Sequence, residues 1–383
     1  MNFATVSDLR ASAKRRLPSF VFDYLDGGAG TEAGMHRNTA TFDDIRFKPR
    51  MLVNIEKRDL STTLLGRKWS LPFGTAPIGF CNLMWPGAEE AIARAAAETG
   101  IPCTLSTAGT TSVEEYIRLA PESAWFQLYV SRFDNITHDI VDRVDRAGYE
   151  TLLVTVDIPL AARRPRDLRN NFSVALKVSP KFIWELLSHP TWSLSTIAAG
   201  IPKFATMQPY MDATGTKQVA GFVASQVSGS FDWDALKRLR ERWKRRLIVK
   251  GLLAAEDAVR ARDLGCDAVV ISNHGGRQLD SLVAPIEVIS EIRAAVGEKF
   301  PLILDSDIRT GEHIAKALAA GADFCLIGRA VMYAVAALGK PGAKLAIDML
   351  ADELSRTLAQ IGHTDLTSLK KAAPIIRSRE RSA

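Results

Sequence analysis

The sequence predicts an α/β fold in which eight parallel strands, each followed by a helix, close into a (β/α)8 barrel of the TIM type. Three observations predict it. Ala-rich segments that end at a glycine are followed by short apolar runs, most clearly at Gly100, Gly148, Gly265 and Gly321. These runs do not alternate with polar residues, which is typical of parallel strands buried on both faces. A residue able to do chemistry follows each run, and such barrels carry their active sites at the C-terminal ends of the strands.

The chain is expected to form one domain, residues 1–383, with an N-terminal cap and one insertion. Residues 1–70 precede the first predicted strand and are expected to form helices and a short hairpin that cap the barrel. Residues 165–230 follow the fourth strand and are too long for an ordinary connection, so they are expected to form a functional loop or lid. An open doubly wound sheet has the same local pattern and is the alternative fold.

Each predicted strand is a short apolar run bounded by turn residues. The strands lie near residues 72–78, 101–106, 124–130, 151–156, 246–250, 267–272, 301–305 and 323–327. The residues that follow or end them are, in the same order, Gly79, Ser106, Tyr129, Asp157, Lys250, Asn273, Asp305 and Gly328. Polar residues at random loop positions would not follow all eight strand ends.

Composition limits the class of protein without choosing a ligand. With 47% hydrophobic and 24% charged residues, the chain reads as an ordinary globular protein. The net charge of +6 favours anionic small molecules, anionic membrane surfaces or nucleic acid. The basic stretch 237–246 is interpreted as the solvated face of a helix, so no nucleic-acid partner is expected.

The cysteines and the N-terminus point to a chain without disulfides or a leader segment. The four cysteines are scattered and form no CxxC pair, so neither a disulfide framework nor a metal site is expected. The first 20 residues lack a long apolar core followed by a cleavage site, and we expect no signal peptide. No run reaches the roughly 18 apolar residues of a membrane-spanning helix.

The densest cluster of reactive residues is Ser272-Asn273-His274-Gly275-Gly276-Arg277-Gln278-Leu279-Asp280. A histidine at a strand end can take a proton from a bound substrate near neutral pH. The glycines let the backbone turn tightly, and Arg277 offers a planar fork of donors that matches a carboxylate. The alternative is a histidine that caps a turn and an arginine on the surface.

The loops after the seventh and eighth strands predict a phosphate site. They contain Asp305-Ser306-Asp307-Ile308-Arg309-Thr310-Gly311 and Ile327-Gly328-Arg329. These loops commonly bind phosphate in (β/α)8 barrels, and glycine N–H groups with two guanidiniums suit a phosphate dianion. The fingerprint GxGxxG is absent, which argues against a nicotinamide cofactor bound in the Rossmann manner.

SNHGGRQLD, VKGLL, LILDSDIRTG and CLIGRA together resemble the FMN-dependent 2-hydroxy acid dehydrogenase and oxidase family. The resemblance runs from about Phe20 to about Leu338, weakens in 165–230, and is stronger to mandelate and L-lactate dehydrogenases than to glycolate oxidase. It implies FMN as cofactor and the oxidation of an L-2-hydroxy acid to the 2-oxo acid.

The resemblance also implies roles for residues at the strand ends. His274 resembles the catalytic base and Asp157 its carboxylate partner. Arg277 and Arg164 resemble the clamp for the substrate carboxylate, with Arg163 as the neighbouring alternative to Arg164. Tyr24 is expected to assist the clamp, and Tyr129 to contact the substrate and stabilise charge in the transition state.

For FMN the resemblance implies contacts from all around the barrel mouth. Lys250 is expected near N1 and the C2 carbonyl of the isoalloxazine, where a positive charge stabilises the anionic reduced flavin. The remaining expected contacts are Ser106, Gln127 and Thr155 on the ring, the backbone of Ala76, Pro77 and Gly79 near its reactive edge, Asp305 on the ribityl hydroxyls, and Arg309, Gly328 and Arg329 on the phosphate.

The electron acceptor that reoxidises the flavin is predicted from position 79 and from the insertion. Position 79 is Gly, where oxidase members of the family tend to carry Ala, which favours a quinone-type or other non-oxygen acceptor. A hydroxy acid oxidase that uses O2 and gives H2O2 is the alternative. Residues 175–211 are rich in aromatic and aliphatic residues with interspersed lysines, and similar dehydrogenases attach to the membrane through this region. The other interpretation is a lid that packs on the barrel or on a neighbouring subunit.

The family resemblance implies a homotetramer. The scattered cysteines favour a reducing compartment, so the protein is expected in the cytoplasm, with peripheral attachment to the inner face of the cell membrane as the alternative. Ala108 stands where glycolate oxidase carries Trp, which leaves room for a larger substrate side chain, with lactate still accepted as an alternative.

Besides the hydroxy acid oxidoreductase, two rival functions remain: an FMN isomerase without net redox, and a non-catalytic protein that binds flavin or a carboxylate. Bleaching of the flavin by hydroxy acids under anaerobic conditions separates all three.

Overall fold

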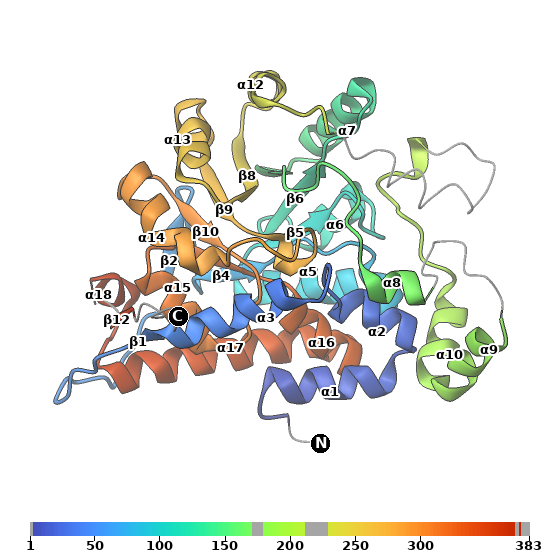
Figure 1. Cartoon of the computed structure of the whole chain (residues 1–383), viewed down its shortest axis with the longest axis horizontal. Helices are drawn as coiled ribbons and strands as arrows, with labels where there is room; N and C mark the ends of the chain where they lie inside the picture. Colours follow the sequence, from blue (N-terminus) through green and yellow to red (C-terminus); the bar gives the residue numbers. More distant parts are fainter. Residues whose placement is uncertain (1–2, 171–178, 211–228, 372–374, 377–383) are drawn as a thin grey trace, which may run out of the picture.

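The computed structural model describes residues 3–170, 179–210, 229–371 and 375–376. Eight parallel strands in these residues close into a barrel in the order β10-β11-β4-β5-β6-β7-β8-β9 (Figure 1). The ring is complete because β11 pairs with both β10 and β4. The predicted (β/α)8 barrel is therefore confirmed, and the open doubly wound sheet is excluded. The strands are β4 (Phe73–Thr75), β5 (Cys103–Ser106), β6 (Ala124–Tyr129), β7 (Thr151–Thr155), β8 (Arg246–Leu252), β9 (Ala268–Ile271), β10 (Leu302–Leu304) and β11 (Phe324–Ile327).

Every barrel strand overlaps its predicted range, and the differences lie at the ends. β4 is shorter than the predicted 72–78, and β8 continues two residues past Lys250 through an irregularity in its pairing with β9. Helices on the outside of the barrel follow the strands. In chain order they are α5 (Ala88–Thr99), α6 (Val113–Leu119), α7 (Asp134–Arg146), α12 (Trp233–Arg242), α13 (Ala255–Asp263), α14 (Pro285–Val296), α15 (Gly311–Ala319) and α16 (Arg329–Leu338).

The inside of the barrel is a packed core with a polar upper layer. Successive side chains of a strand point to opposite faces, so residues two apart share the interior. The interior apolar cluster contains Trp125, Leu153, Ile248 and Ile303. Two residues further along the same strands stand Gln127, Thr155, Lys250 and Asp305, all buried. The period of two therefore puts apolar residues at the bottom of the barrel and polar residues at its C-terminal mouth.

The N-terminal cap contributes to both ends of the barrel. Leu64 and Trp69 of its hairpin join the interior cluster, and the Trp69 ring meets the Trp125 ring edge-on at 6.2 Å, so the hairpin closes the bottom. The first helix of the cap runs along α16, and the third contacts the His274–Gly276 turn at the mouth. The cap consists of α1 (Val6–Arg16), α2 (Ser19–Asp26), α3 (Ala33–Ala40), η1 (Thr41–Asp44), β1 (Ile45–Arg46), β2 (Thr62–Leu64) and β3 (Arg67–Trp69). A short α4 (Cys81–Met84) follows β4, and the chain ends with α17 (Pro341–Ile361), α18 (Leu366–Lys370) and β12 (Ile375–Ile376), which pairs with β1.

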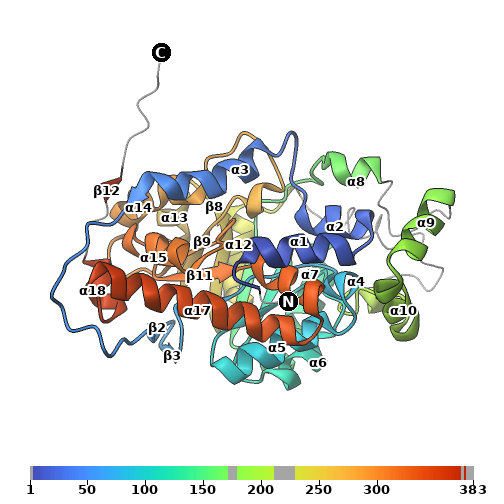
Figure 2. The same ribbon diagram turned by 90° about the horizontal axis from the view of Figure 1, so that it is seen from below.

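The insertion after β7 carries its own helices. These are α8 (Pro165–Arg169), α9 (Pro180–Ser188), α10 (Pro190–Ala199) and η2 (Gln208–Tyr210), while residues 171–178 and 211–228 lie outside the described residues. Figures 1 and 2 both place α9 and α10 at the edge of the molecule, beside α2. Within the described part of the chain, no helix is both long enough and apolar enough to cross a membrane.

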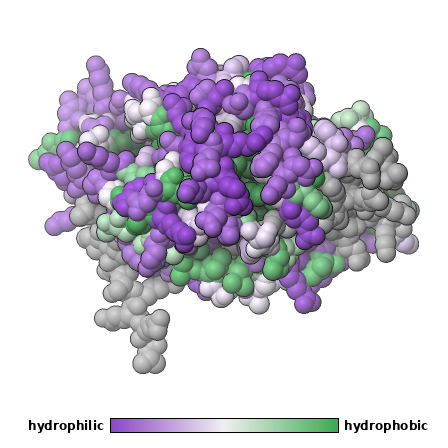
Figure 3. Space-filling model, turned by 90° about the horizontal axis from the view of Figure 1, so that it is seen from above, coloured by the Kyte–Doolittle hydropathy of each residue, from purple (hydrophilic) through white to green (hydrophobic). Residues whose placement is uncertain are grey.

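The basic stretch 237–246 forms most of α12 and the start of β8, and several of its arginines pair within the protein. Arg240 binds Asp267 at 2.9 Å and Arg242 binds Asp142 at 2.5 Å. Hydrophilic side chains dominate the face of the molecule that contains α12 (Figure 3). This arrangement supports the interpretation of the stretch as a solvated helix face.

Candidate active site

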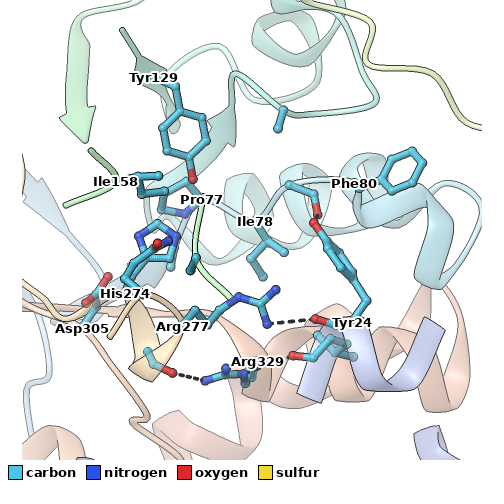
Figure 4. Close-up of a pocket in the computed structure, with 18 of the residues that line it drawn as sticks. Tyr24, Pro77, Ile78, Phe80, Tyr129, Ile158, His274, Arg277, Asp305 and Arg329 are labelled. Carbon is cyan, nitrogen blue, oxygen red and sulfur yellow. Dashed lines mark hydrogen bonds between the residues drawn. The ribbon is translucent and has the colours of Figure 1, made fainter. Parts of the chain in front are cut away.

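A cavity of about 440 Å³ opens at the C-terminal ends of the barrel strands (Figure 4). Its volume falls in the range of small-molecule and cofactor sites, about 300–1,000 Å³. Most of the predicted site residues line it, although they come from every part of the chain. These are Tyr24, Ala76, Pro77, Gly79, Tyr129, Arg164, Lys250, His274, Arg277, Asp305, Arg309, Gly328 and Arg329.

Four predicted residues do not line this cavity. Asp157 lies behind His274, bound to its ring. Ser106, Gln127 and Thr155 are buried in the polar layer below, where the Ser106 hydroxyl donates to Gln127 Oε1 at 2.8 Å. The amide nitrogen of Gln127 and the hydroxyl of Thr155 are buried without a hydrogen-bond partner among the described residues. An unpaired buried polar group costs about 1–3 kcal/mol, so these two atoms favour a ligand that pairs with them.

His274 and Asp157 form a pair at the cavity edge. His274 Nδ1 lies 3.0 Å from Asp157 Oδ1. Burial raises the pKa of Asp157, but the charges of His274 and Lys250 and the His274 hydrogen bond outweigh it and hold that pKa below its usual value. Since an ionised carboxylate can only accept, Nδ1 carries a proton, and in the neutral form of the ring the lone pair is on Nε2. His274 is therefore set up to take a proton at Nε2.

A glycine makes room for this carboxylate. A Cβ on Gly251 would lie 2.6 Å from Cβ and Cγ of Asp157, and its φ of 110° falls in the region that favours glycine. The backbone at the end of β8 can thus approach Asp157 only because residue 251 has no side chain.

Two guanidiniums meet over the Tyr24 ring. The centre of the Arg277 guanidinium lies 5.3 Å from the ring centroid and that of Arg164 lies 5.8 Å from it. Arg277 donates through Nη1 to the Tyr24 carbonyl at 2.9 Å (Figure 4). The same Nη1 donates to the Gly27 carbonyl at 2.9 Å, and the two bonds fix the orientation of the guanidinium. Arg163 is exposed and does not line the cavity, so the structure brings Arg164 to the site instead.

The electrostatics of the clamp favour an anion. Burial, followed by the positive charges of Arg164 and Arg329, lowers the pKa of Arg277 to about 9. A negative ligand between Arg164 and Arg277 would relieve this destabilisation of the cation. Tyr129 faces the same space; burial, then the charges of Asp157 and Tyr24, raises the pKa of its phenol, so the hydroxyl stays a donor at neutral pH.

Lys250 is a buried cation on the floor of the site. Its Nζ lies 2.9 Å from Asp305 Oδ2 and donates to Ser272 Oγ at 2.8 Å. Burial lowers the pKa of Lys250, but the charges of Asp305 and Asp157 outweigh burial and raise it. The lysine is thus charged and only 4% exposed at the mouth of the barrel.

Arg329 and Arg309 share one buried carboxylate, Asp307. Arg329 Nη1 lies 2.9 Å from Asp307 Oδ1, and Arg309 also binds this oxygen. Arg329 donates further to the carbonyls of Leu25 and Gly275. One guanidinium therefore joins the end of α2, the loop that contains His274 and the loop after β10.

Sequence reasoning gave no role to several residues that the structure brings to the site. The Ser272 hydroxyl oxygen accepts hydrogen bonds from Lys250 Nζ and from the His274 backbone N–H, the latter at 3.1 Å. Its place two residues before His274 on an inward-facing register was a usable signal. Asp167 forms an ion pair with Arg164, with 3.4 Å between Asp167 Oδ2 and Arg164 Nε. Phe204 and Met207 also line the cavity, and their irregular segment carries no periodic pattern that would have indicated it.

The chain is similar to known proteins along nearly all of its length. The model of the FMN-dependent dehydrogenase family matches residues 13–375. The (S)-mandelate dehydrogenase of Pseudomonas putida is 41% identical over 368 residues, which cover 96% of this chain and 93% of the relative. The L-lactate dehydrogenase of Caulobacter vibrioides is 36% identical over 373 residues, which cover 97% of each chain.

Solved structures give the same result. A crystal structure described as the monotopic membrane protein (S)-mandelate dehydrogenase matches with a TM-score of 0.94 at 40% identity, covering 98% of this chain and 100% of that one. A crystal structure of mandelate oxidase matches with a TM-score of 0.83 at 33% identity, covering 97% of this chain and 98% of that one. The chain is therefore similar along its whole length to both a dehydrogenase and an oxidase.

Proposed function

Because the chain belongs to the FMN-dependent dehydrogenase family, we propose that it oxidises an L-2-hydroxy acid to the corresponding 2-oxo acid. One observation carries this proposal: His274, held by Asp157 at 3.0 Å, lines the same cavity as Arg164 and Arg277. A proton acceptor beside a carboxylate clamp is what a 2-hydroxy acid requires, since its hydroxyl and carboxylate sit on adjacent carbons.

The residues of the site fit FMN. The unpaired Gln127 amide and Thr155 hydroxyl are suited to the polar edge of a flavin ring, and the buried Lys250 supplies a cation beside them. Arg309 and Arg329 supply guanidiniums for the phosphate. FMN, when bound, accepts the two electrons that leave the substrate.

The protein's own groups then perform the remaining work. Arg277 and Arg164 bind the substrate carboxylate, and their fixed orientation can contribute several kcal/mol to the barrier reduction. The oxidation also removes two hydrogens from the substrate: one leaves with the two electrons for the bound FMN, and His274 Nε2 takes the other as a proton. The Asp157 carboxylate stabilises the imidazolium that results. Tyr129 donates its hydroxyl to the substrate oxygen as charge develops there.

Anaerobic titration of the yellow holoenzyme tests the reaction class. Lactate, mandelate and longer 2-hydroxy acids are added under argon while the visible flavin band is followed. Bleaching by a 2-hydroxy acid, without bleaching by the matching 3-hydroxy acid, supports the proposal. A band that shifts without bleaching indicates binding alone, and a band that no acid affects points to a flavin isomerase.

The electron acceptor is proposed to be a quinone-type compound, with O2 as the alternative. Gly79 supports a dehydrogenase, whereas the likeness to a mandelate oxidase keeps oxygen in consideration. Mixing the reduced protein with a soluble quinone or with oxygenated buffer separates them. If the quinone reoxidises the reduced protein more slowly than oxygen does, the proposal is contradicted.

Peripheral attachment at the cytoplasmic face of the cell membrane is proposed through α9 and α10. Their outer side exposes Trp184 at 69%, Leu187 at 70% and Ile197 at 75%. Large exposed apolar patches mark interaction sites, and a solved relative is described as monotopic. Sedimentation with anionic vesicles tests this: Leu187→Glu is expected to weaken binding, whereas Met51→Glu, at an apolar residue of the cap that is 70% exposed, is expected to leave it unchanged.

A homotetramer is proposed on family grounds, and light scattering in detergent measures the oligomeric state.

A lid function for residues 179–210 is the alternative to membrane contact. Equal vesicle binding by wild type and Leu187→Glu would favour that alternative.

A further inference from the structure

The cavity wall includes two residues that no barrel strand supplies. Phe204 and Met207 lie between α10 and η2, in the insertion, and line the same cavity as His274 and Arg277. Both are almost fully buried, with exposed fractions of 7% and 3%. An irregular segment on the edge of a protein usually places such side chains at its surface, so their burial needs an explanation.

Three contacts seat this segment on the barrel. The Ala205 N–H donates to the Gly109 carbonyl at 3.1 Å, and Arg143 Nη1 donates to the Thr206 carbonyl at 3.0 Å. The Phe204 ring stacks on Phe80, with ring centroids 4.7 Å apart and an angle of 27° between the planes. The segment is therefore fixed to the loop after β5 and to the outer helix α7.

The chemistry around Phe204 and Met207 is apolar. Phe80 and Met84 line the cavity beside them, and the loop after β5 contributes Ala108, whose side chain is small. Most of the charged residues of the cavity belong to the barrel loops and the cap, and Asp167 of α8, which pairs with Arg164, is the exception. A ligand whose carboxylate and hydroxyl are held by the arginines and His274 could place its side chain against these apolar groups.

We propose that Phe204 and Met207 form the wall that contacts the side chain of the bound hydroxy acid and select acids with a bulky apolar side chain. This inference rests on the proposed function and extends it to the class of substrate. The specificity of the enzyme is then determined by the insertion, while the barrel supplies the chemistry. One element would combine the substrate wall on its inner side with the exposed apolar surface of α9 and α10 on its outer side.

The wall can be tested by truncating one side chain at a time. Phe204→Ala removes the stacked ring, and Met207→Ala removes the thioether. Phe182→Ala is the matched control, because Phe182 lies in the same insertion and packs on Phe20 at 5.6 Å without lining the cavity. Retention of FMN and the thermal midpoint report folding, and Phe204→Leu and Met207→Leu provide milder changes if the alanine variants lose FMN.

Anaerobic flavin reduction by mandelate and by lactate is the first readout. The ratio of kcat/KM for mandelate to that for lactate is expected to fall about tenfold to a hundredfold in Phe204→Ala and Met207→Ala, because apolar groups in a pocket discriminate to this extent. The Phe182→Ala ratio is expected to match wild type. Equal loss for both acids, or a ratio within about twofold of wild type, overturns the proposal.

Calorimetric binding of phenylglyoxylate and pyruvate is the second readout and needs no turnover. The same variants are expected to lose affinity for phenylglyoxylate selectively, with pyruvate unaffected. If no hydroxy acid bleaches the wild-type flavin, the proposed function fails, and the calorimetric ratio still decides whether Phe204 and Met207 form an apolar wall. If no variant changes the affinity for either oxo acid, the proposal that Phe204 and Met207 form the wall is wrong.

Discussion

Replacing Asp157 with asparagine tests the pair that prepares His274 for proton uptake. The change keeps the shape of the side chain, so the close approach of Gly251 survives. It removes the negative charge that lies 3.0 Å from His274 Nδ1, and the amide can offer an N–H to the ring where the carboxylate only accepts. Both effects act against an imidazolium.

The magnitude follows from the distance. Two unit charges 3.0 Å apart interact by about 5.5 kcal/mol at an effective dielectric constant of about 20, which is a ceiling for this pair. The His274 side chain is 19% exposed, and the asparagine retains a dipole, so about half of this is expected to be lost in the transition state. About 3 kcal/mol corresponds to a rate of flavin reduction about two orders of magnitude slower.

Anaerobic stopped-flow mixing of the Asp157→Asn holoenzyme with saturating hydroxy acid measures this rate. FMN content and the affinity for the 2-oxo acid serve as controls, since neither the phosphate site nor the arginine clamp is altered. A rate of reduction within about threefold of wild type would refute the reasoning, because it would mean that the charge does not act on the reacting proton.

The remaining predictions address the clamp, the cofactor floor and the cap. Arg277→Lys is expected to raise KM by at least about tenfold, because lysine cannot bind a carboxylate while it also holds the carbonyls at the end of α2; steady-state KM against FMN content checks this. Lys250→Met leaves a buried carboxylate without its cation and is expected to lower both the thermal midpoint and the reduction potential of bound FMN, measured by calorimetry and dye equilibration. Asp26→Asn is expected to destabilise the fold by about 1.5–3 kcal/mol at pH 7, because it weakens charge-assisted hydrogen bonds to a buried carboxylate whose partners Arg10 and Arg166 are partly exposed. Burial raises the pKa of Asp26, but its arginine and tyrosine partners outweigh it and hold that pKa below 3.8; the stabilisation is therefore full above pH 3.8 and lost as the pH falls through the folded-state pKa, so the gap in thermal midpoints is expected to shrink only in acid.

The barrel was predictable because its pattern is local and repeated. Each strand is a short apolar run, and each run ends in a residue that faces the mouth, so counting along the chain found the eight strands within a few residues. The same period of two explains why Lys250 and Asp305 could be assigned to the site. They follow Ile248 and Ile303 of the interior cluster on the same face of their strands.

Other parts of the site depend on contacts that no local pattern encodes. Asp157 and His274 are 117 residues apart, and only the family resemblance joined them before their distance was known. Asp307 pairs with Arg309 and Arg329 from a loop in which Ser306 and Asp307 have positive φ angles, and the residue types alone do not predict that conformation. Phe204 and Met207 reach the cavity through the packing of an insertion whose sequence shows no periodicity pointing inward.

The most direct test of the account is the anaerobic reaction of His274→Ala with a hydroxy acid that bleaches the wild-type flavin. The variant is expected to bind FMN, to bind the 2-oxo acid through its arginines, and to keep its visible flavin band when the hydroxy acid is added. A variant that bleaches as fast as wild type would show that the proton leaves by another route, and the assignment of this cavity's chemistry to His274 would be wrong.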